Sequence, residues 1–394
     1  MTPERITGTL AAHFDRIQRG ALIVGLAALV LAILDGIRAP EQFFRSYLLA
    51  YAFWIGFPLG CAAFLMVHHL TGGFWGLLIR RPLEAGTRTL PLLVLFLLPL
   101  FGGLGRLYSW IHPNLVAADP VLKYKELYLN LPFFLIRNAI YFLIWLAITR
   151  RLNHWSDVQD RVRDPNAALH LENMSGPGLV LYGLTVTFFS IDWFMSLEPH
   201  WFSTIYGMIF MVLQVLTALA LVVFVAGLLS QREPLAHAVT ADRFNDLGNL
   251  VLTFVMLWAY LSFSQFLIIW TGDLYTEIPW YIPRTEGGWA IVAIVIVFLS
   301  FAIPFYLLLM RAIKRSARSL LVVCGALILV NFLDVYWMIV PSFQTASPRF
   351  YFLDFLLPVG MGGVWVADFI RHLKSRPLLP LHDTRFEGAL EHGD

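Results

Sequence analysis

Long runs of apolar residues, separated by short polar segments, follow one another along the whole chain. A helix needs about 20 residues, at about 1.5 Å of rise each, to cross the hydrocarbon core of a bilayer. Ten runs approach or reach this length, and none alternates with the two-residue period of a barrel strand. They cover residues 20–37, 47–69, 89–104, 128–149, 177–194, 204–229, 246–270, 288–311, 319–341 and 350–372. The pattern predicts an all-α, polytopic membrane protein with ten transmembrane helices.

Composition agrees with this fold class, because 58% of the residues are hydrophobic and only 14% are charged, against about a quarter in soluble domains. Cys61 and Cys324 lie far apart inside apolar runs, with no metal-binding spacing and no disulfide framework. Nothing in the pattern predicts a metal site, nucleotide binding or a nucleic-acid partner. We expect an N-terminal tail at residues 1–19, a membrane domain at 20–372 and a C-terminal tail at 373–394.

The distribution of Lys and Arg predicts the orientation. The two tails and the even-numbered loops carry 20 of these residues, and the odd-numbered loops carry 7. Because positive charge is retained on the cytoplasmic side, both termini are predicted to be cytoplasmic. The segments 105–127, 195–203 and 271–287 then face outward. They are rich in aromatic residues and proline, and we expect them to dock a periplasmic subunit.

Chemistry-bearing residues concentrate between the fifth and sixth runs. Asp192, Glu198 and His200 stand there beside Trp201, and Pro199 ends any continuing helix. Two carboxylates and an imidazole at the membrane surface are suited to exchange protons with a ligand that lies between helix ends. The alternative is an ordinary belt of interfacial aromatic residues.

Arg137 lies about nine residues inside the fourth run, where an unpaired charge is costly. We expect a carboxylate partner in the outer half of the membrane, among Asp192, Asp334 and Asp354. A functional role and a purely structural ion pair are equally compatible with the pattern.

The seventh run carries a polar stripe. Its members are spaced to share one helix face and are Asp246, Asn249, Thr253, Tyr260 and Ser264. With Asp368 and His372 of the tenth run, this stripe forms a candidate proton path from the cytoplasm toward Asp334. The alternative is that these polar residues only hold helices together.

Two further patterns have simpler interpretations. The adjacent His68 and His69 suggest bis-histidine haem, but the chain offers only His372 as an intraspan partner, so we interpret them as histidines that reach the interface. Segment 150–176 carries charges of both signs and is predicted to be a solvated surface, with room for a short amphipathic helix.

Four blocks of sequence resemble a known family, the ActF-type subunit of bacterial alternative complex III in the NrfD-like membrane superfamily. The longest is Asp192-Trp-Phe-Met-Ser-Leu-Glu-Pro-His-Trp-Phe-Ser-Thr-Ile-Tyr-Gly207. The others are Lys125-Glu-Leu-Tyr-Leu-Asn-Leu-Pro-Phe-Phe-Leu-Ile-Arg137, Asp246-Leu-Gly-Asn-Leu and Trp258-Ala-Tyr-Leu-Ser-Phe-Ser-Gln-Phe-Leu-Ile-Ile-Trp270.

The resemblance implies two four-helix bundles, helices 2–5 and 6–9, flanked by helices 1 and 10. It implies a bacterial inner-membrane subunit with no haem or iron–sulfur centre of its own, in a complex that oxidises quinol and reduces a periplasmic acceptor. The partners would be iron–sulfur and c-haem subunits and an ActC-like sister subunit with the main quinol site. This chain would add a second quinone pocket, for menaquinone or ubiquinone, or conduct protons, with structural lipids around it.

Two rival functions remain open at the level of sequence. Ten helices with charge at mid-depth suit a secondary transporter, although no paired broken helices occur at matching places in the two halves. A purely structural membrane anchor is the other. Purification separates the first rival, since a transporter is isolated alone and a subunit with its partners.

Overall fold

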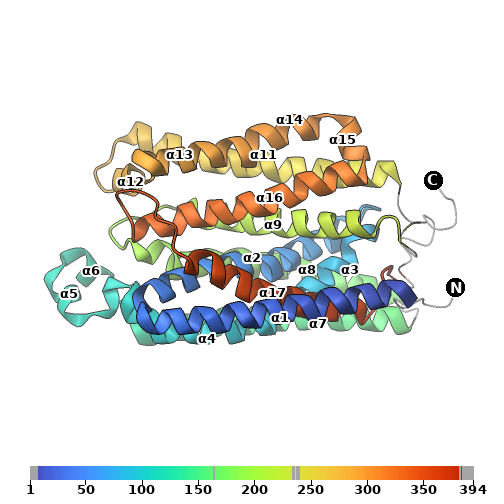
Figure 1. The fold of residues 1–394 in the computed structure, drawn as a ribbon, viewed down its shortest axis with the longest axis horizontal. Coiled ribbons are helices and arrows are strands. Elements are labelled where there is room, and N and C mark those ends of the chain that lie inside the picture. Colours follow the sequence, from blue (N-terminus) through green and yellow to red (C-terminus); the bar gives the residue numbers. More distant parts are fainter. Residues whose placement is uncertain (1–7, 163–164, 233–235, 237–239, 381–382, 384–394) are drawn as a thin grey trace.

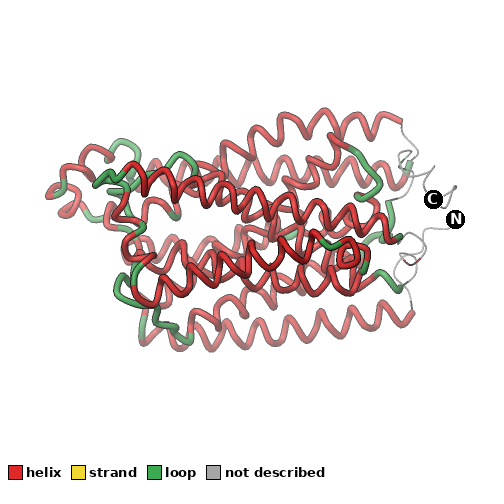
Figure 2. The backbone as a smooth tube through the Cα atoms, turned by 90° about the horizontal axis from the view of Figure 1, so that it is seen from above, coloured by secondary structure: helices red, strands yellow, loops and turns green. Residues whose placement is uncertain are grey.

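The computed structural model describes residues 8–162, 165–232, 236, 240–380 and 383, which form helices joined by turns with no strand among them. Within these residues, ten helices are long and apolar enough to cross a membrane. The all-α, multi-pass architecture is therefore confirmed at this level. Figure 1 shows the long helices running side by side along one direction, and Figure 2 shows the same bundle from above.

Five spans form the first half of the chain. They are α1 (Gly8–Arg38), α2 (Pro40–Thr71), α3 (Gly76–Arg88) continued by α4 (Leu90–Leu107), α7 (Leu131–Arg161) and α8 (Pro165–Trp193). Asn130 caps α7, because its side-chain oxygen accepts a hydrogen bond from the backbone N–H of Phe133 at 2.9 Å. Between α4 and α7 lie η1 (Ser109–Ile111), α5 (Pro113–Ala118) and α6 (Pro120–Lys125).

Five spans form the second half. They are α9 (Tyr206–Leu229), α11 (Ala241–Gly272), the segment α13 (Gly287–Ile296), η4 (Val297–Ala302) and α14 (Ile303–Leu309), then α16 (Ala317–Ile339) and α17 (Leu353–Lys374). The short elements are η2 (Met195–Leu197), η3 (Ile278–Trp280), α12 (Ile282–Thr285), α15 (Arg311–Arg315) and η5 (Val340–Ser342). A π-helical turn, η4, thus interrupts the eighth span.

Several helices extend beyond the apolar runs that predict them. Residues 8–19, which the pattern assigns to a tail, belong to α1, and residues 76–88 form α3. Of the segment predicted as a solvated surface, residues 150–161 continue α7 and 165–176 begin α8. Hydrophobicity marks only the part of a helix that crosses hydrocarbon, so polar helix ends fall outside the runs.

α2 lies at the centre of the molecule and is almost entirely buried. It contacts α1, α3, α4, α8, α9, α16 and α17. Close approach to α9 depends on Gly60, where an added Cβ would lie 2.2 Å from the carbonyl oxygen of Gln214. Gly25 and Gly363 join α1 to α17 in the same way, since a Cβ on Gly363 would lie 2.4 Å from the oxygen of Ala21.

The bundle has two ends, which we name by what they carry. The termini end is where α1 begins and α17 ends, and there Lys374 forms an ion pair with Asp15. The loop end carries α5, α6, η2, η3 and α12, and the α5–α6 hairpin (residues 113–125) projects beyond the long helices (Figure 1). The residues singled out around 192–201 lie at the loop end.

Candidate functional site at the loop end

A buried ion pair between α7 and α8 forms the core of the site. Arg137 Nε donates to Asp192 Oδ2 at 2.9 Å, and Arg137 Nη2 donates to Asp192 Oδ1 at 2.8 Å. The Asp192 side chain is completely buried and that of Arg137 is 8% exposed. This bidentate contact confirms that Arg137 has a carboxylate partner, and that the partner is Asp192.

Aromatic side chains enclose the pair. Tyr141 Oη donates to Asp192 Oδ2 at 2.9 Å, so the carboxylate accepts three hydrogen bonds. The Arg137 guanidinium lies 3.8 Å from the ring centre of Tyr128 and 4.3 Å from that of Phe133. Arg137 Nη1 also donates to the Tyr128 carbonyl at 2.9 Å. The guanidinium charge is therefore compensated by the carboxylate and two ring faces, and the carboxylate charge by the guanidinium and the Tyr141 hydroxyl.

Neighbouring polar contacts fix the helix ends around the pair. Trp193 Nε1 donates to the side-chain oxygen of Asn138 at 2.6 Å. Tyr108, which follows α4, donates to the Trp193 carbonyl at 2.7 Å. Three elements, α4, α7 and α8, are thus joined within one turn of Asp192.

A cavity of about 230 Å³ lies beside the ion pair. Its lining consists of Lys125, Tyr128, Leu129, Ile191, Met195, Ser196, Pro199 and Trp201. Tyr128 contacts both the cavity and the Arg137 guanidinium. Trp201 is buried, and within the described chain its Nε1 has no hydrogen-bond partner. An apolar cavity of this kind is suited to an apolar ring.

Glu198 belongs to a second cluster, built around Arg284 of α12. Arg284 Nη2 donates to Glu198 Oε1 at 2.8 Å and to the Met338 carbonyl at 3.0 Å. Ser342 donates to the same Glu198 oxygen at 2.6 Å. Burial lowers the pKa of Arg284, and the Glu198 carboxylate opposes this effect. Glu198 thus stabilises the charged form of the buried guanidinium.

A stacked indole pair connects this cluster to the cavity. The rings of Trp201 and Trp280 are 4.7 Å apart and nearly parallel, and the Arg284 guanidinium lies 3.8 Å from the Trp280 ring centre. Sequence reasoning places Arg284 only in an outward loop and misses its complete burial. The adjacent Trp280 and Tyr281 are the signal of a packed, rather than solvated, loop.

Two contacts join the α5–α6 hairpin to the residues after η2. His200 Nε2 and Asp119 Oδ2 are 2.7 Å apart, and Lys125 Nζ donates to the Pro199 carbonyl at 2.5 Å. The Asp119 side chain also caps α6, accepting a hydrogen bond from Val121 N–H at 2.9 Å. His200 is thus bound to Asp119, a residue that the sequence pattern does not single out.

The other two outer carboxylates lie in separate environments. Asp334 of α16 is buried and accepts a hydrogen bond from Trp258 Nε1 of α11 at 2.8 Å. Asp354 of α17 accepts hydrogen bonds from Ser46 at 2.5 Å and from Gln42 at 3.2 Å. The expected outer group is therefore divided among several local pairs, because each carboxylate finds a donor on its nearest helix.

The polar stripe of α11 has the expected spacing but faces away from the bundle. Asp246, Asn249, Thr253 and Tyr260 are exposed, and Ser264 is half-buried. Their local contacts include a hydrogen bond from Lys314 Nζ to Asn249 at 2.6 Å and one from Thr253 to the Asn249 carbonyl at 2.9 Å. Periodicity establishes that residues share a face, but not which face packs.

At the termini end, Asp368 and His372 occupy one face of α17. Asp368 pairs with Arg371 at 2.6 Å and lies 3.6 Å from His372 Nε2. Among the described residues, no hydrogen bond or ion pair joins Asp246 to Asp368 or to Asp334. The described side chains therefore do not link these three carboxylates by direct hydrogen bonds, and the proton path stays a prediction.

His68 and His69 are buried, which corrects the interpretation that they reach the membrane interface. The reason is that α3 turns back against α2 and covers them. A Cβ on Gly76 would lie 2.0 Å from the His68 ring, and the Trp75 and His68 ring centres are 4.9 Å apart. Among the described residues, no group of three or more His, Cys, Asp or Glu side chains is placed to hold a metal ion.

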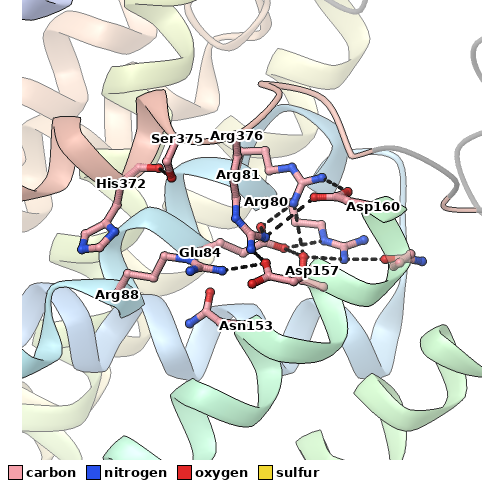
Figure 3. Close-up of polar contacts among 12 residues, drawn as sticks. Arg80, Arg81, Glu84, Arg88, Asn153, Asp157, Asp160, His372, Ser375 and Arg376 are labelled. Atoms are coloured by element: carbon pink, nitrogen blue, oxygen red, sulfur yellow. Dashed lines mark hydrogen bonds and ion pairs between the residues drawn. The ribbon is translucent and has the colours of Figure 1, made fainter. Parts of the chain in front are cut away.

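Sequence reasoning also misses a buried charge network at the termini end, shown in Figure 3. Its four basic and four acidic side chains come from α3, α7 and the segment after α17. They are Arg80, Arg81, Arg88 and Arg376 with Glu84, Asp157, Asp160 and Asp383. Arg80 Nε and Arg81 Nη1 approach the two oxygens of Glu84 at 2.9 and 2.6 Å.

The sequence does contain a signal for part of this network. Arg80 and Arg81 stand four and three residues before Glu84, the spacing of helical ion pairs. The contacts of Arg80 with Asp383 and of Arg376 with Asp157 join residues about 200 or more positions apart and have no local signal. Burial lowers the pKa of Arg376 to about 10, so this guanidinium is still charged at neutral pH.

Comparison with known proteins adds no family assignment, because no family model and no curated protein matches this chain.

Proposed function

We propose that this chain is a membrane subunit of a quinol-oxidising electron-transfer complex, without a redox centre of its own. It would contribute a quinone-binding site at the loop end and accept protons there. The observation that carries the proposal is the cavity beside the buried Arg137–Asp192 pair, with Tyr128 in contact with both. The resemblance to ActF-type subunits of alternative complex III supports the same assignment.

The chemistry of the cavity fits a quinone head group. A volume of about 230 Å³ accommodates one substituted ring, whose isoprenoid tail would continue into the lipid. Leu129, Ile191 and Met195 offer apolar contact, and the buried Nε1 of Trp201, unpartnered among the described residues, would become the donor for a carbonyl or hydroxyl oxygen of the ring. A buried donor that gains its missing hydrogen bond contributes about 1 kcal/mol or more to binding.

Quinol oxidation releases protons as well as electrons, so the site needs proton acceptors. Asp192, Glu198 and His200 all lie within the loop end, each held by one cationic or carboxylate partner. Electrons would pass to iron–sulfur and c-haem centres of partner subunits.

The orientation and grouping of helices belong to the same proposal. We place both termini in the cytoplasm of a bacterial inner membrane, supported by the excess of Lys and Arg at that end. Contacts around two rings of helices support two four-helix bundles. One ring consists of α2, α3–α4, α7 and α8, and the other of α9, α11, α13–α14 and α16. α1 and α17 pack together beside α2.

Exposed apolar side chains at the loop end support docking of a partner subunit there. Tyr124, Leu127 and Tyr275 are 88%, 90% and 88% exposed, in segments beyond the long helices. The exposed polar face of α11 is a second contact surface, which we assign to a sister membrane subunit. A partner there would cover Asp246 and Tyr260 and complete any proton path.

Purification of the affinity-tagged chain from native membranes tests the proposal. The expected result is a complex with the absorption spectrum of c-haem, the electron paramagnetic resonance signals of iron–sulfur clusters, and quinol oxidation activity. Isolation of the chain alone under mild detergent conditions would contradict it and favour a transporter.

A further inference from the structure

The loop-end cavity lies between two segments of chain that are distant in sequence. Lys125, Tyr128 and Leu129 form one side, and residues 191–201 form the other. The same two segments are bridged by His200 with Asp119 and by Lys125 with the Pro199 carbonyl. Lys125 and Pro199, which form one of these bridges, also line the cavity, and His200 directly follows Pro199.

We propose that the Asp119–His200 pair is a pH-sensitive clasp. Protonation of His200 holds the α5–α6 hairpin against the residues after η2 and so keeps the cavity at the width it has in this structure, and loss of that proton loosens the hairpin. The role of the clasp in ligand access depends on the proposed function, whereas the clasp itself is a property of this chain alone.

The charges around His200 give the direction of the effect. Burial alone would raise the pKa of Asp119, but hydrogen bonds from Val121 N–H and His200 hold the pKa below its usual value. Asp119 therefore stays ionised between about pH 5 and 8, the range in which histidine ordinarily changes charge. An imidazolium attracts this carboxylate more strongly than a neutral imidazole does.

The neighbouring charged groups have partners of their own. Lys125 Nζ is bound to the Pro199 carbonyl, Glu198 is bound to Arg284, and Lys123 is paired with Glu126 at 2.6 Å. A second histidine at the loop end, His112 just before α5, contacts the Gly105 carbonyl rather than a carboxylate. Of these two histidines, His200 is thus the one whose charge acts between the residues after η2 and the α5–α6 hairpin.

The expected effect is modest but local. The two side chains are 61% and 28% exposed, and an ion pair of this exposure changes an equilibrium by roughly two- to fivefold. α5 and α6 are only 6 residues each, and besides the clasp the hairpin is held by the buried side chains of Val116 and Leu122.

Hydrogen–deuterium exchange of the full chain in nanodiscs tests the clasp without any ligand. Protection is measured at pH 5.5 and 8.0, relative to intrinsic exchange at each pH, in peptides covering 113–126 and 195–203. The wild type should be about two- to fivefold better protected at pH 5.5. His200→Gln and Asp119→Asn should abolish this difference, and Asn retains the cap of α6. His200→Lys, which is charged at both values, should remain protected at both.

His112→Gln is the matched control and should keep the wild-type response. Equal protection of the wild type at the two pH values, or an undiminished pH response in His200→Gln, would overturn the clasp. Binding of decylubiquinone to the purified complex is measured separately. Failure of decylubiquinone to bind, with the exchange results as expected, would overturn the proposed function and leave the clasp standing.

Discussion

Replacement of Arg137 by leucine is the most informative perturbation of the site. Asp192 is completely buried and would keep only the Tyr141 hydrogen bond of the three it accepts. Removing one member of a buried ion pair costs about 3–5 kcal/mol, because the other charge stays in a low-dielectric environment. We expect Arg137→Leu to lower the free energy of unfolding by that amount.

The double variant distinguishes the ion pair from simple packing. Arg137→Leu with Asp192→Leu removes both charges, and replacing a whole buried pair by apolar residues is often close to neutral. We therefore expect the double variant to regain at least about 2 kcal/mol relative to Arg137→Leu. The assay is unfolding in mixed micelles of increasing SDS fraction, followed by tryptophan fluorescence.

An exposed pair provides the control. Lys123 and Glu126 are paired at 2.6 Å but have side chains 63% and 49% exposed. Lys123→Leu should change the free energy of unfolding by less than about 1 kcal/mol. Additive effects of Arg137→Leu and Asp192→Leu, or a cost as small as that of the control, would refute the assigned role of the pair.

Three further predictions concern other parts of the chain. Glu84→Gln should lower the free energy of unfolding by about 3–5 kcal/mol in the same assay, because the buried Arg80 and Arg81 lose the carboxylate charge that they share. As a control, Glu41→Gln, which breaks an exposed ion pair with Arg45, should lower it by less than about 1 kcal/mol. Trp201→Phe should weaken decylubiquinone binding about 3- to 10-fold in a titration, since it removes the N–H donor, and Trp110→Phe, whose indole does not line the cavity, should not. Ser300→Ala should leave stability unchanged or raise it by up to about 1 kcal/mol, because the hydroxyl is buried in η4 without a partner within the described chain.

The number and type of spans could be predicted from the sequence because hydrocarbon thickness fixes the length of each apolar run. The pairing of Arg137 with a carboxylate followed from the cost of an isolated charge at that depth. Both predictions rest on the membrane as a solvent, which acts on each segment independently of the rest of the fold.

The features that the sequence could not predict depend on which helix faces pack against one another. The stripe through Asn249 and Tyr260 has helical spacing, yet it points outward because α9 and α16 pack on other faces of α11. In the sequence, Arg284 and Arg80 lie outside the apolar runs and resemble solvated loop charges. In the fold both are buried, with the distant residues Glu198 and Asp383 as their partners. Long-range partners leave no local pattern, so burial of these charges is visible only in the fold.

Photolabelling of the native complex with an azido-quinone tests the central claim most directly. After illumination, proteolysis and mass spectrometry locate the modified residues in this chain. The account predicts labels within residues 125–129 and 191–201, reduced in the Trp201→Phe variant and by competing decylubiquinone. Competable labels confined to other segments of the chain, or to partner subunits alone, would contradict a quinone site at the loop end.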